Sequence, residues 1–391
     1  MNVRPVYLVA YGRSPYCKAF KGRLSKIHPV QFGGQTLAGV LQRIPQLKPE
    51  DIDDVVVGCA MPKGVQDYNI ARQVAQRAGL PDRVPAMTIN RFCSSGLQTV
   101  ATAANTIACG QAEVIVAGGV ESMSMVPMAT DPNIVEPYLL KHAPDNYISM
   151  GMTAEHVAAE YHISREDMER MACESHRKAA QAHAAGWFED QIIPVDGLDG
   201  QGNPVVLTVD EGVRPGTSME SLAQLKPCFK EDGVVTAGTS SQMTDGAGFV
   251  VLVSEEKLQE LGVTPLAKFV GFAVDGVPAR IMGIGPIKAI PKALKLAGLQ
   301  LSDMDDIELN EAFASQALAC VRTLGIPEDK LNPEGGAMAL GHPLGASGAM
   351  LLCKAISHMR RCGGRYFMVT MCIGGGQGAA GIFEFYGLSA F

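Results

Sequence analysis

The segment NRFCSSGLQ, residues 90–98, places a cysteine where a nucleophile is expected. Cys93 lies on a Ser/Gly turn between an apolar run and the start of a helical pattern. Unpaired backbone N–H groups and the positive end of a helix dipole at such a turn lower a thiol pKa, and the turn exposes the sulfur. Ser94, Ser95 and Gly96 permit a sharp turn, although the segment does not match GxSxG. Taken alone, the turn fits a buried structural cysteine as well as a nucleophile.

A single histidine lies in the glycine-rich segment GGAMALGHPLGASG, residues 335–348. His342 precedes another helical pattern there, and an imidazole on such a turn can take the thiol proton of Cys93 and hold the sulfur as a thiolate. The other histidines have no comparable setting. Five of them lie in a polar stretch in the middle of the chain, and their spacings with cysteines do not match a zinc site.

Two further motifs carry groups suited to proton transfer and anion binding. In MCIGGGQG, Cys372 can donate or accept a proton at carbon, and the backbone N–H of Gly374 can stabilise an oxyanion. In NEAFASQA, Asn310 can position a water molecule or donate a hydrogen bond to a developing enolate oxygen. Each motif is weak alone, because glycine turns commonly follow strands and an Asn before a helix is normally an N-cap.

Alternating strand and helix patterns must position these groups. Short β-branched runs alternate with helical-period segments up to residue 119 and again from residue 249, which predicts a mixed α/β sheet covered on both faces. We expect strands at VYLVAY, DVVVGCA, AMTIN, EVIVAGG, FVVLVS, LAKFVGFAV, DIELN and YFMVTMC, and helices over residues 37–44, 70–78, 94–109, 153–160, 165–184, 287–297, 311–324 and 347–359.

The two ends of the chain repeat one order of features. A strand ending at Asn90, the Cys93 turn, a helix and a strand correspond to Asn332, the His342 turn, a helix and a strand. Duplicated sheets placed together would bring both turns to one cleft. Residues 120–244 break the rhythm, and we expect an insertion packed over the first unit. The predicted division is an N-terminal half (1–119 and 245–259), an inserted loop domain (120–244) and a C-terminal half (260–391).

Bulk composition excludes several classes of protein. A chain of 391 residues is too long for one core, so two or more packed units are expected. A net charge of -7 without any Lys/Arg run argues against a nucleic-acid-binding protein. The start lacks a signal-peptide pattern and no apolar run is long enough to cross a bilayer, so we expect a cytoplasmic protein without membrane insertion.

The ten cysteines show neither disulfide spacing nor the ligand spacing of a zinc or iron–sulfur site. We therefore expect reduced thiols and no metal.

Together the four motifs resemble those of the thiolase family, in the same order and at comparable spacings. The resemblance covers nearly the whole chain and includes RSP, VPAMTINR, AGGVESMS, SMGMTAEHVA, DEGVRP, TAGTSSQMTDGA and MGIGP. It implies an α/β fold of duplicated βαβαβαββ halves in five α-β-α-β-α layers, with an inserted loop domain.

The resemblance also implies roles for single residues. Cys93 would carry the acyl group, His342 would activate it, and Cys372 would act as acid and base at the α-carbon of acetyl-CoA. A water on Asn310 together with His342 would form one oxyanion hole, and the N–H groups of Cys93 and Gly374 the other. The residues implied to bind substrate and coenzyme A are Arg214, Ser221 and Leu225 near the nucleotide, Ala237, Ser241, Met282, Ala312 and Phe313 along the pantetheine, and Met150.

The activity implied is that of an acetyl-CoA C-acyltransferase, which cleaves 3-ketoacyl-CoA reversibly to acetyl-CoA and a shortened acyl-CoA in fatty acid β-oxidation. Coenzyme A would be a substrate, and no cofactor is expected. Members specialised for acetoacetyl-CoA synthesis often have His in place of Ser149 and Gly in place of Gln242, so both residues favour the degradative type. The biosynthetic acetoacetyl-CoA thiolase is the alternative. Family members assemble as dimers or pairs of dimers, so a homodimer or homotetramer is expected.

Two more distant classes of protein fit the sequence less well. Ketoacyl synthases and hydroxymethylglutaryl-CoA synthases share a cysteine-bearing turn but lack the Cys-Ile-Gly-Gly-Gly ending. An inactive, thiolase-like lipid-binding or scaffold protein would have lost Cys93, His342 or Cys372, and all three are present.

Overall fold

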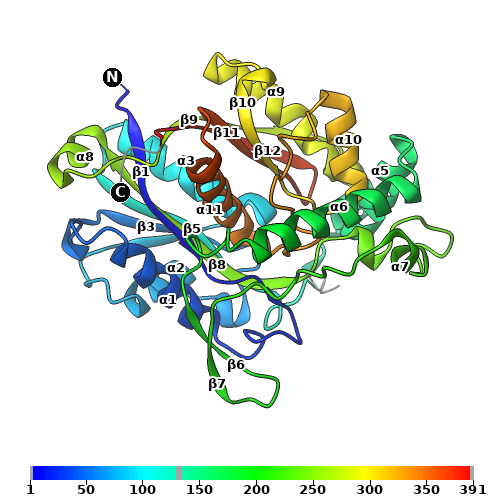
Figure 1. Cartoon of the computed structure of the whole chain (residues 1–391), viewed down its shortest axis with the longest axis horizontal. Helices are drawn as coiled ribbons and strands as arrows, with labels where there is room; N and C mark the ends of the chain where they lie inside the picture. Colours follow the sequence, from blue (N-terminus) through cyan, green and yellow to red (C-terminus); the bar gives the residue numbers. More distant parts are fainter. Residues whose placement is uncertain (1–2, 129–133, 388–391) are drawn as a thin grey trace.

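The central feature of the fold is a ten-stranded sheet, seen in a computed structural model that describes residues 3–128 and 134–387 (Figure 1). The strands lie in the order β10-β11-β12-β9-β1-β8-β5-β3-β4, with the short β2 (Cys17–Lys18) beside β8. Their bounds are β1 Val6–Arg13, β3 Asp54–Gly58, β4 Ala86–Ile89, β5 Val114–Ser122, β8 Thr244–Ser254, β9 Ala267–Gly276, β10 Met304–Leu309, β11 Tyr366–Ile373 and β12 Gln377–Phe385.

The sheet consists of two halves with the same pairing scheme. In the first half β4, β3 and β5 run parallel, and β8 and β1 follow as antiparallel neighbours. In the second half Leu331 forms a parallel bridge with β10, and β10 pairs in parallel with β11. Strands β12 and β9 follow as antiparallel neighbours. Antiparallel pairing of β1 with β9 joins the halves. The predicted duplication is therefore confirmed.

Helices cover both faces of each half and give five layers. Helices α1 (Pro29–Gln42) and α2 (Ile70–Arg77) cover the outer face of the first half, and α9 (Gly285–Ala297) and α10 (Ala314–Leu324) cover that of the second. Between the halves lie α3 (Ser95–Ala108) and α11 (Leu344–Cys362), whose apolar side chains share one core with strands of both halves. Figure 1 shows this central pair with the outer helices on opposite sides. The predicted α-β-α-β-α order is confirmed.

Burial on both faces explains the strand pattern in the sequence. Every residue of β5 and β8 is buried, so these strands appear as continuous apolar runs instead of alternating ones. The two central helices meet at their first turns, where a side chain on Gly348 would place its Cβ 2.3 Å from the backbone nitrogen of Leu97. Only glycine permits that approach, which brings the two predicted catalytic turns together.

The insertion packs differently from the prediction. Its helices α5 (Met150–Glu160) and α6 (Arg165–Ala184) share an apolar cluster with the second half, whereas the hairpin of β6 (Val195–Leu198) and β7 (Pro204–Leu207) packs on the first. The expectation that the whole segment covers the first unit is therefore wrong. The apolar side chains of α5 and α6 pack against Phe313 and its neighbours, which are distant in sequence. The remaining helices are α4 (Pro137–His142), α7 (Met219–Ala223) and α8 (Glu255–Leu261).

Other differences lie at element ends. Helix α1 begins at Pro29 instead of residue 37, because the His28 side chain caps it and Pro29 suits a first turn. Helix α10 begins at Ala314 instead of residue 311, so Asn310 is not its N-cap. Strand β12 was not predicted, because it contains several Gly and Ala residues and few of the β-branched residues that indicate a strand. Within residues 3–128 and 134–387, no helix combines the length and apolarity needed to span a membrane.

Candidate active site

Cys93 lies on a strained turn after β4. Phe92, in the 3-10 turn Phe92–Ser94, has φ of 42°, a left-handed conformation that is costly for an aromatic residue. Side chains hold the turn: Asn90 Oδ1 accepts from the Phe92 N–H at 2.8 Å, and Ser95 Oγ accepts from the Arg91 N–H at 2.9 Å. The chain therefore turns abruptly from strand to helix and leaves Cys93 partly accessible at the N-terminal end of α3.

The surroundings of the Cys93 thiol are apolar. Ala60, Met123 and Leu344 belong to the cluster against which it packs. Burial raises the pKa of Cys93 to about 11, although hydrogen bonds from the backbone N–H groups of Gly374 and of Cys93 itself act to lower it. The predicted lowering of this pKa is wrong for the ligand-free protein. Removal of water destabilises the thiolate by more free energy than the two backbone N–H groups contribute to its stabilisation.

His342 is buried, with 5% of its surface exposed, and its ring is held on both sides. Its Nδ1 lies 2.6 Å from Ser347 Oγ, and its Nε2 lies 3.4 Å from Asn310 Nδ2. An amide nitrogen only donates, so Nε2 accepts in this contact and the ring proton resides on Nδ1. Burial lowers the pKa of His342 to about 4, so the ring is neutral near pH 7.

The backbone of His342 is fixed by a neighbouring strand. Its N–H donates to the Gln242 carbonyl at 3.0 Å and to Thr244 Oγ1 at 3.1 Å. Neither residue was predicted to act here, nor was Ser347. The only sequence signal was a serine in the otherwise apolar and glycine-rich first turns of a helix, five residues after the histidine.

The Cys93 thiol and the His342 imidazole do not form a preformed ion pair. The pKa of Cys93 lies at about 11 and that of His342 at about 4, so thiol and imidazole both stay uncharged near neutral pH. The predicted resting thiolate is therefore not supported. The arrangement suits general-base transfer of the proton as the sulfur attacks, with Nε2 as the acceptor.

The end of β11 supplies the second sulfur. Cys372 is fully buried, and burial followed by the nearby charge of Cys93 raises its pKa well above the ordinary thiol value. Gly374 follows at a point where a Cβ would lie 3.5 Å from Met150 Sδ. The Asn310 N–H donates to the Thr370 carbonyl at 3.0 Å, which ties Asn310 to the same strand.

Five predicted residues are thus joined by a chain of contacts. The Gly374 N–H donates to the Cys93 sulfur, and a charge on Cys93 would raise the pKa of Cys372. Asn310 is bonded to β11, and His342 contacts Asn310. They come from the β4–α3 turn, the β11 end, the segment before α10 and the loop before α11. The arrangement offers a nucleophile, a base, a second thiol and a backbone donor.

Of the residues predicted to contact the pantetheine, all but Ala237, which is exposed on the 3-10 turn Ala237–Thr239, gather beside this chain of contacts together with Met150. Met150, Met282, Ala312 and Phe313 pack in or against the apolar cluster that contains Cys372. The Ser241 N–H donates to the Ala312 carbonyl at 2.9 Å. The wall next to the second sulfur is therefore apolar and is built from the insertion and the C-terminal half.

The residues predicted near the nucleotide lie farther out, on the surface of the insertion. Ser221 belongs to a capping box at the start of α7, and Leu225 lies against the 3-10 turn Ala237–Thr239, where a Cβ on Gly238 would be 2.7 Å from Leu225 Cδ1. Arg214 is exposed, and its backbone N–H donates to His176 Nδ1 at 3.1 Å.

Arg165 on α6 fixes the α7 segment. Its guanidinium donates to the backbone carbonyls of Leu222, Ala223 and Leu225. Arg165 was not among the residues predicted from the sequence. In the described part of the chain, no group of three or more His, Cys, Asp and Glu side chains is placed to hold a metal ion.

Comparison with known proteins agrees with this geometry. Residues 6–256 match the thiolase N-terminal domain and residues 263–385 the thiolase C-terminal domain. The 3-ketoacyl-CoA thiolase of Bacillus subtilis is 49% identical over 98% of this chain and 100% of its own length.

Two solved structures are similar throughout. The Bacillus anthracis acetyl-CoA acetyltransferase is 38% identical with a TM-score of 0.92, covering 99% of this chain and 100% of that one. Human mitochondrial 3-ketoacyl-CoA thiolase is 39% identical with a TM-score of 0.89, covering 98% and 100%. The chain belongs to the thiolase family of acyltransferases.

Proposed function

We propose that this protein is a 3-ketoacyl-CoA thiolase, which cleaves 3-ketoacyl-CoA with coenzyme A to acetyl-CoA and an acyl-CoA two carbons shorter. The observation that carries the proposal is the meeting of the Cys93 sulfur, the Gly374 N–H and the Cys372 thiol, with His342 and Asn310 linked to the same strand. The 49% identity to a 3-ketoacyl-CoA thiolase over the full chain supports it.

In the proposed first step Cys93 attacks the keto carbon while His342 accepts its proton. The N–H groups of Cys93 and Gly374 stabilise the oxyanion that forms on the former keto oxygen. The carbon–carbon bond then breaks and releases the enolate of acetyl-CoA. Its oxygen is stabilised by His342 and by a water on Asn310, and Cys372 protonates its carbon. The proton that His342 took from Cys93 then passes to the Cys372 thiolate, so both groups return to their starting state.

In the second step the thiol of coenzyme A attacks the acyl group on Cys93 while His342 accepts the proton of that thiol. The bond from the acyl carbon to the Cys93 sulfur then breaks, and His342 returns the proton to Cys93. The acyl group passes from one thioester to another of nearly equal energy, so the reaction is reversible and concentrations set its direction. Two cysteines are needed because acyl transfer and proton transfer at carbon are separate events. These steps need no metal or redox cofactor, and coenzyme A serves as a substrate.

We propose the degradative type, acting in fatty acid β-oxidation. Ser149 caps α5 by accepting the Met152 N–H at 3.4 Å, and Gln242 donates to the carbonyls of Gly212, Met338 and Ala339 at 2.9–3.0 Å. Both positions differ from the residues usual in acetoacetyl-CoA-forming members. The second candidate, acetoacetyl-CoA synthesis, is favoured by the likeness to an acetyl-CoA acetyltransferase structure.

The test is thiolysis of acetoacetyl-CoA beside 3-ketohexanoyl-, 3-ketooctanoyl- and 3-ketododecanoyl-CoA, followed by loss of the enolate absorbance. Comparable kcat/KM values for the longer substrates are expected. Activity confined to acetoacetyl-CoA supports the second candidate. Absence of thiolysis with every substrate contradicts both and favours a binding role.

For the assembly, we propose a homodimer or homotetramer in the cytoplasm. Strand β4 pairs only with β3 among the described strands and carries the exposed Met87, and such an edge is suited to pairing with a second copy. Light scattering after gel filtration tests this. We also propose that the halves and the insertion act as the units 1–119 with 245–259, 120–244 and 260–391, with coenzyme A bound by the insertion.

A further inference from the structure

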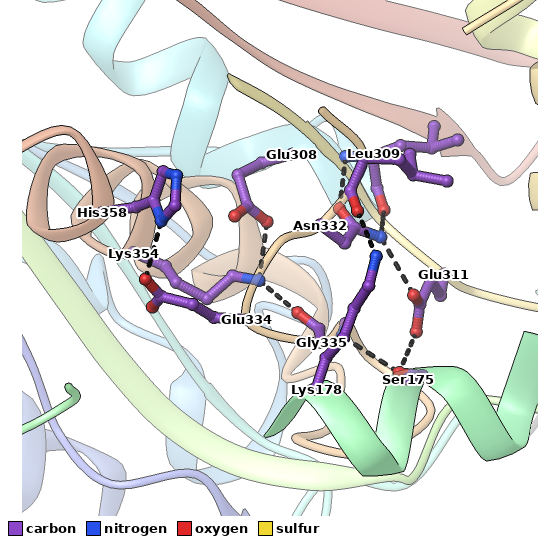
Figure 2. A network of polar contacts seen from close by, with 12 residues as sticks. Ser175, Lys178, Glu308, Leu309, Glu311, Asn332, Glu334, Gly335, Lys354 and His358 are labelled. Atoms are coloured by element: carbon purple, nitrogen blue, oxygen red, sulfur yellow. Dashed lines mark hydrogen bonds and ion pairs between the residues drawn. The ribbon is translucent and has the colours of Figure 1, made fainter. Parts of the chain in front are cut away.

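Glu311 is a buried carboxylate that the proposed reaction does not use, and it directly follows Asn310. It is 3% exposed and lies on the extended segment between β10 and α10. Three donors reach its side chain: Ser175 Oγ at 2.7 Å, Asn332 Nδ2 at 3.0 Å and the Met338 N–H at 3.2 Å. Figure 2 shows two of these contacts converging on the carboxylate. A carboxylate accepts on both oxygens, so it satisfies all three donors.

The donors come from two distant segments. Asn332 and Met338 belong to residues 332–343, between the bridge at Leu331 and α11, which we call the histidine loop. Ser175 belongs to α6 in the insertion, and its Oγ also accepts the Gly336 N–H at 3.0 Å. One carboxylate therefore links the insertion, the histidine loop and the segment of Asn310.

The loop backbone lies directly on this carboxylate. A Cβ on Gly336 would lie 2.2 Å from Glu311 Cδ, so only glycine permits the approach. Asn332, with φ of 41°, bonds both the N–H and the carbonyl of Leu309 at 2.9 Å, next to Asn310. Glu311 thus holds the histidine loop, which carries His342, against the segment that carries Asn310.

We propose that Glu311 is a positioning residue for this contact. Its three hydrogen bonds set the separation of the Asn310 amide from the His342 imidazole, and hence the shape of the enolate oxyanion site. The inference rests on the proposed function. Without the carboxylate, Ser175, Asn332 and Met338 would be left with buried donors, and the loop would shift to satisfy them. A displacement of about 1 Å at a catalytic site lowers the rate roughly 100-fold.

The test is Glu311→Gln, which keeps the volume but turns one accepting oxygen into an NH2 group that faces donors. We measure kcat and the KM for coenzyme A in acetoacetyl-CoA thiolysis, and the exchange of acetyl-CoA α-hydrogens with deuterated water. Both kcat and exchange are expected to fall roughly 100-fold, while the KM changes less than about twofold, because positioning affects the transition state only.

Glu308→Gln is the matched control. Glu308 is an equally buried glutamate on β10, but it pairs with Lys354 at 2.8 Å (Figure 2). Lys354 also donates to the Gly335 carbonyl of the histidine loop, but the side chains of Glu308 and Lys354 make no hydrogen bond to Asn310, Asn332 or Met338 among the contacts of the described residues. The kcat of Glu308→Gln is therefore expected to stay within about threefold of the unmodified protein even if its melting temperature falls. Ser175→Ala removes one of the three donors and is expected to lower kcat about tenfold, which keeps the test decisive if Glu311→Gln does not fold.

The outcomes separate the two proposals. An unmodified protein without thiolysis overturns the proposed function. An active unmodified protein whose Glu311→Gln and Ser175→Ala variants keep full kcat overturns the role of Glu311. Equal losses of kcat in Glu308→Gln and Glu311→Gln overturn it as well, since they indicate a general effect of buried charge.

Discussion

The turn of Cys93 and the loop of His342 occupy equivalent places in the two halves but are built differently. Five residues, 90–94, connect β4 to α3, whereas the twelve residues 332–343 lie between the Leu331 bridge and α11. The short connection leaves Cys93 partly accessible, while the long one buries His342. This difference fits the proposed roles, since a nucleophile must meet its substrate, whereas a base gains from being fixed and shielded from water.

The supports differ in the same way. The backbone of the Cys93 turn is supported by side chains of its own segment, Asn90 and Ser95. Two longer-range bonds add to this support, from Asn90 to the Ala60 carbonyl and from Arg91 to Gln377. The histidine loop is held by residues far away in sequence, including Thr244, Glu311 and Ser175. The two halves share one scaffold, but the longer connection depends on more side chains from distant parts of the chain than the shorter one.

The largest effect on activity is expected for Cys93→Ala. Thiolysis is expected to fall by roughly 10⁵-fold, because removal of a nucleophile removes the acyl-enzyme route. Intact-protein mass spectrometry after mixing with acyl-CoA should show no acyl adduct. The exposed Cys109 provides the control, since Cys109→Ala should acylate normally. An acyl adduct on the Cys93→Ala protein would contradict the assignment.

Cys372→Ala separates the two sulfurs. The variant should still accept an acyl group from an acyl-CoA on Cys93, because this reversal of the second step does not use the second thiol. Carbon–carbon cleavage of a 3-ketoacyl-CoA should slow by roughly 10³–10⁴-fold. Mass spectrometry of the acyl-enzyme and thiolysis kinetics on one sample measure both. Loss of acylation as well would mean that Cys372 supports the Cys93 site structurally.

His342→Ala examines the buried member of the pair. Loss of a general base is expected to slow acylation by roughly 10³-fold near pH 7. Rapid-quench measurement of acyl-enzyme formation gives the rate, and circular dichroism checks the fold. A rate within tenfold of the unmodified protein would indicate that another group takes the proton.

The pH dependence of alkylation sharpens the contrast between a neutral pair and an ion pair. Only the thiolate reacts with iodoacetamide, and a pKa of about 11 means that the thiolate fraction of Cys93 rises about tenfold per pH unit up to that value. Peptide mass spectrometry between pH 6 and 10 should therefore show a steady rise. For N-acetylcysteine, the control, the rise of the alkylation rate with pH should level off near pH 8.5–9. A plateau near neutral pH would reveal a resting thiolate and imidazolium.

The smallest effect concerns the contact that unites the halves. In Gly348→Ala the new Cβ would press on the Leu97 backbone at 2.3 Å, so the free energy of unfolding should fall by about 3 kcal/mol. Urea unfolding measures this. Gly200→Ala is the control, because no atom lies within 4 Å of its added Cβ, and it should change stability little. Equal stability of the two variants would mean that α3 and α11 can separate without loss.

Much of the fold was accessible from the sequence because its signals are local. The bounds of α6, Arg165–Ala184, match the predicted helix, since Ser164 caps it and Glu166 and Asp167 occupy its first turn. The alternation of strands and helices predicted a sheet covered on both faces, and the fully buried β8 agrees with it. The duplicated order of motifs predicted two matching halves that meet at their turns, and in the structure the first turns of α3 and α11, which follow the Cys93 and His342 segments, are in contact.

The sequence by itself determined which side chains are available for chemistry and which short segments form strands and helices, because caps, turns and periodicity act over a few neighbouring residues. Only the tertiary structure decided that the pKa of Cys93 is raised and that Glu311 braces the histidine loop. Burial and buried hydrogen bonds depend on residues brought in from elsewhere in the chain, such as Met123, Leu344 and Ser175. Their effect on a site arises only when the layers have packed.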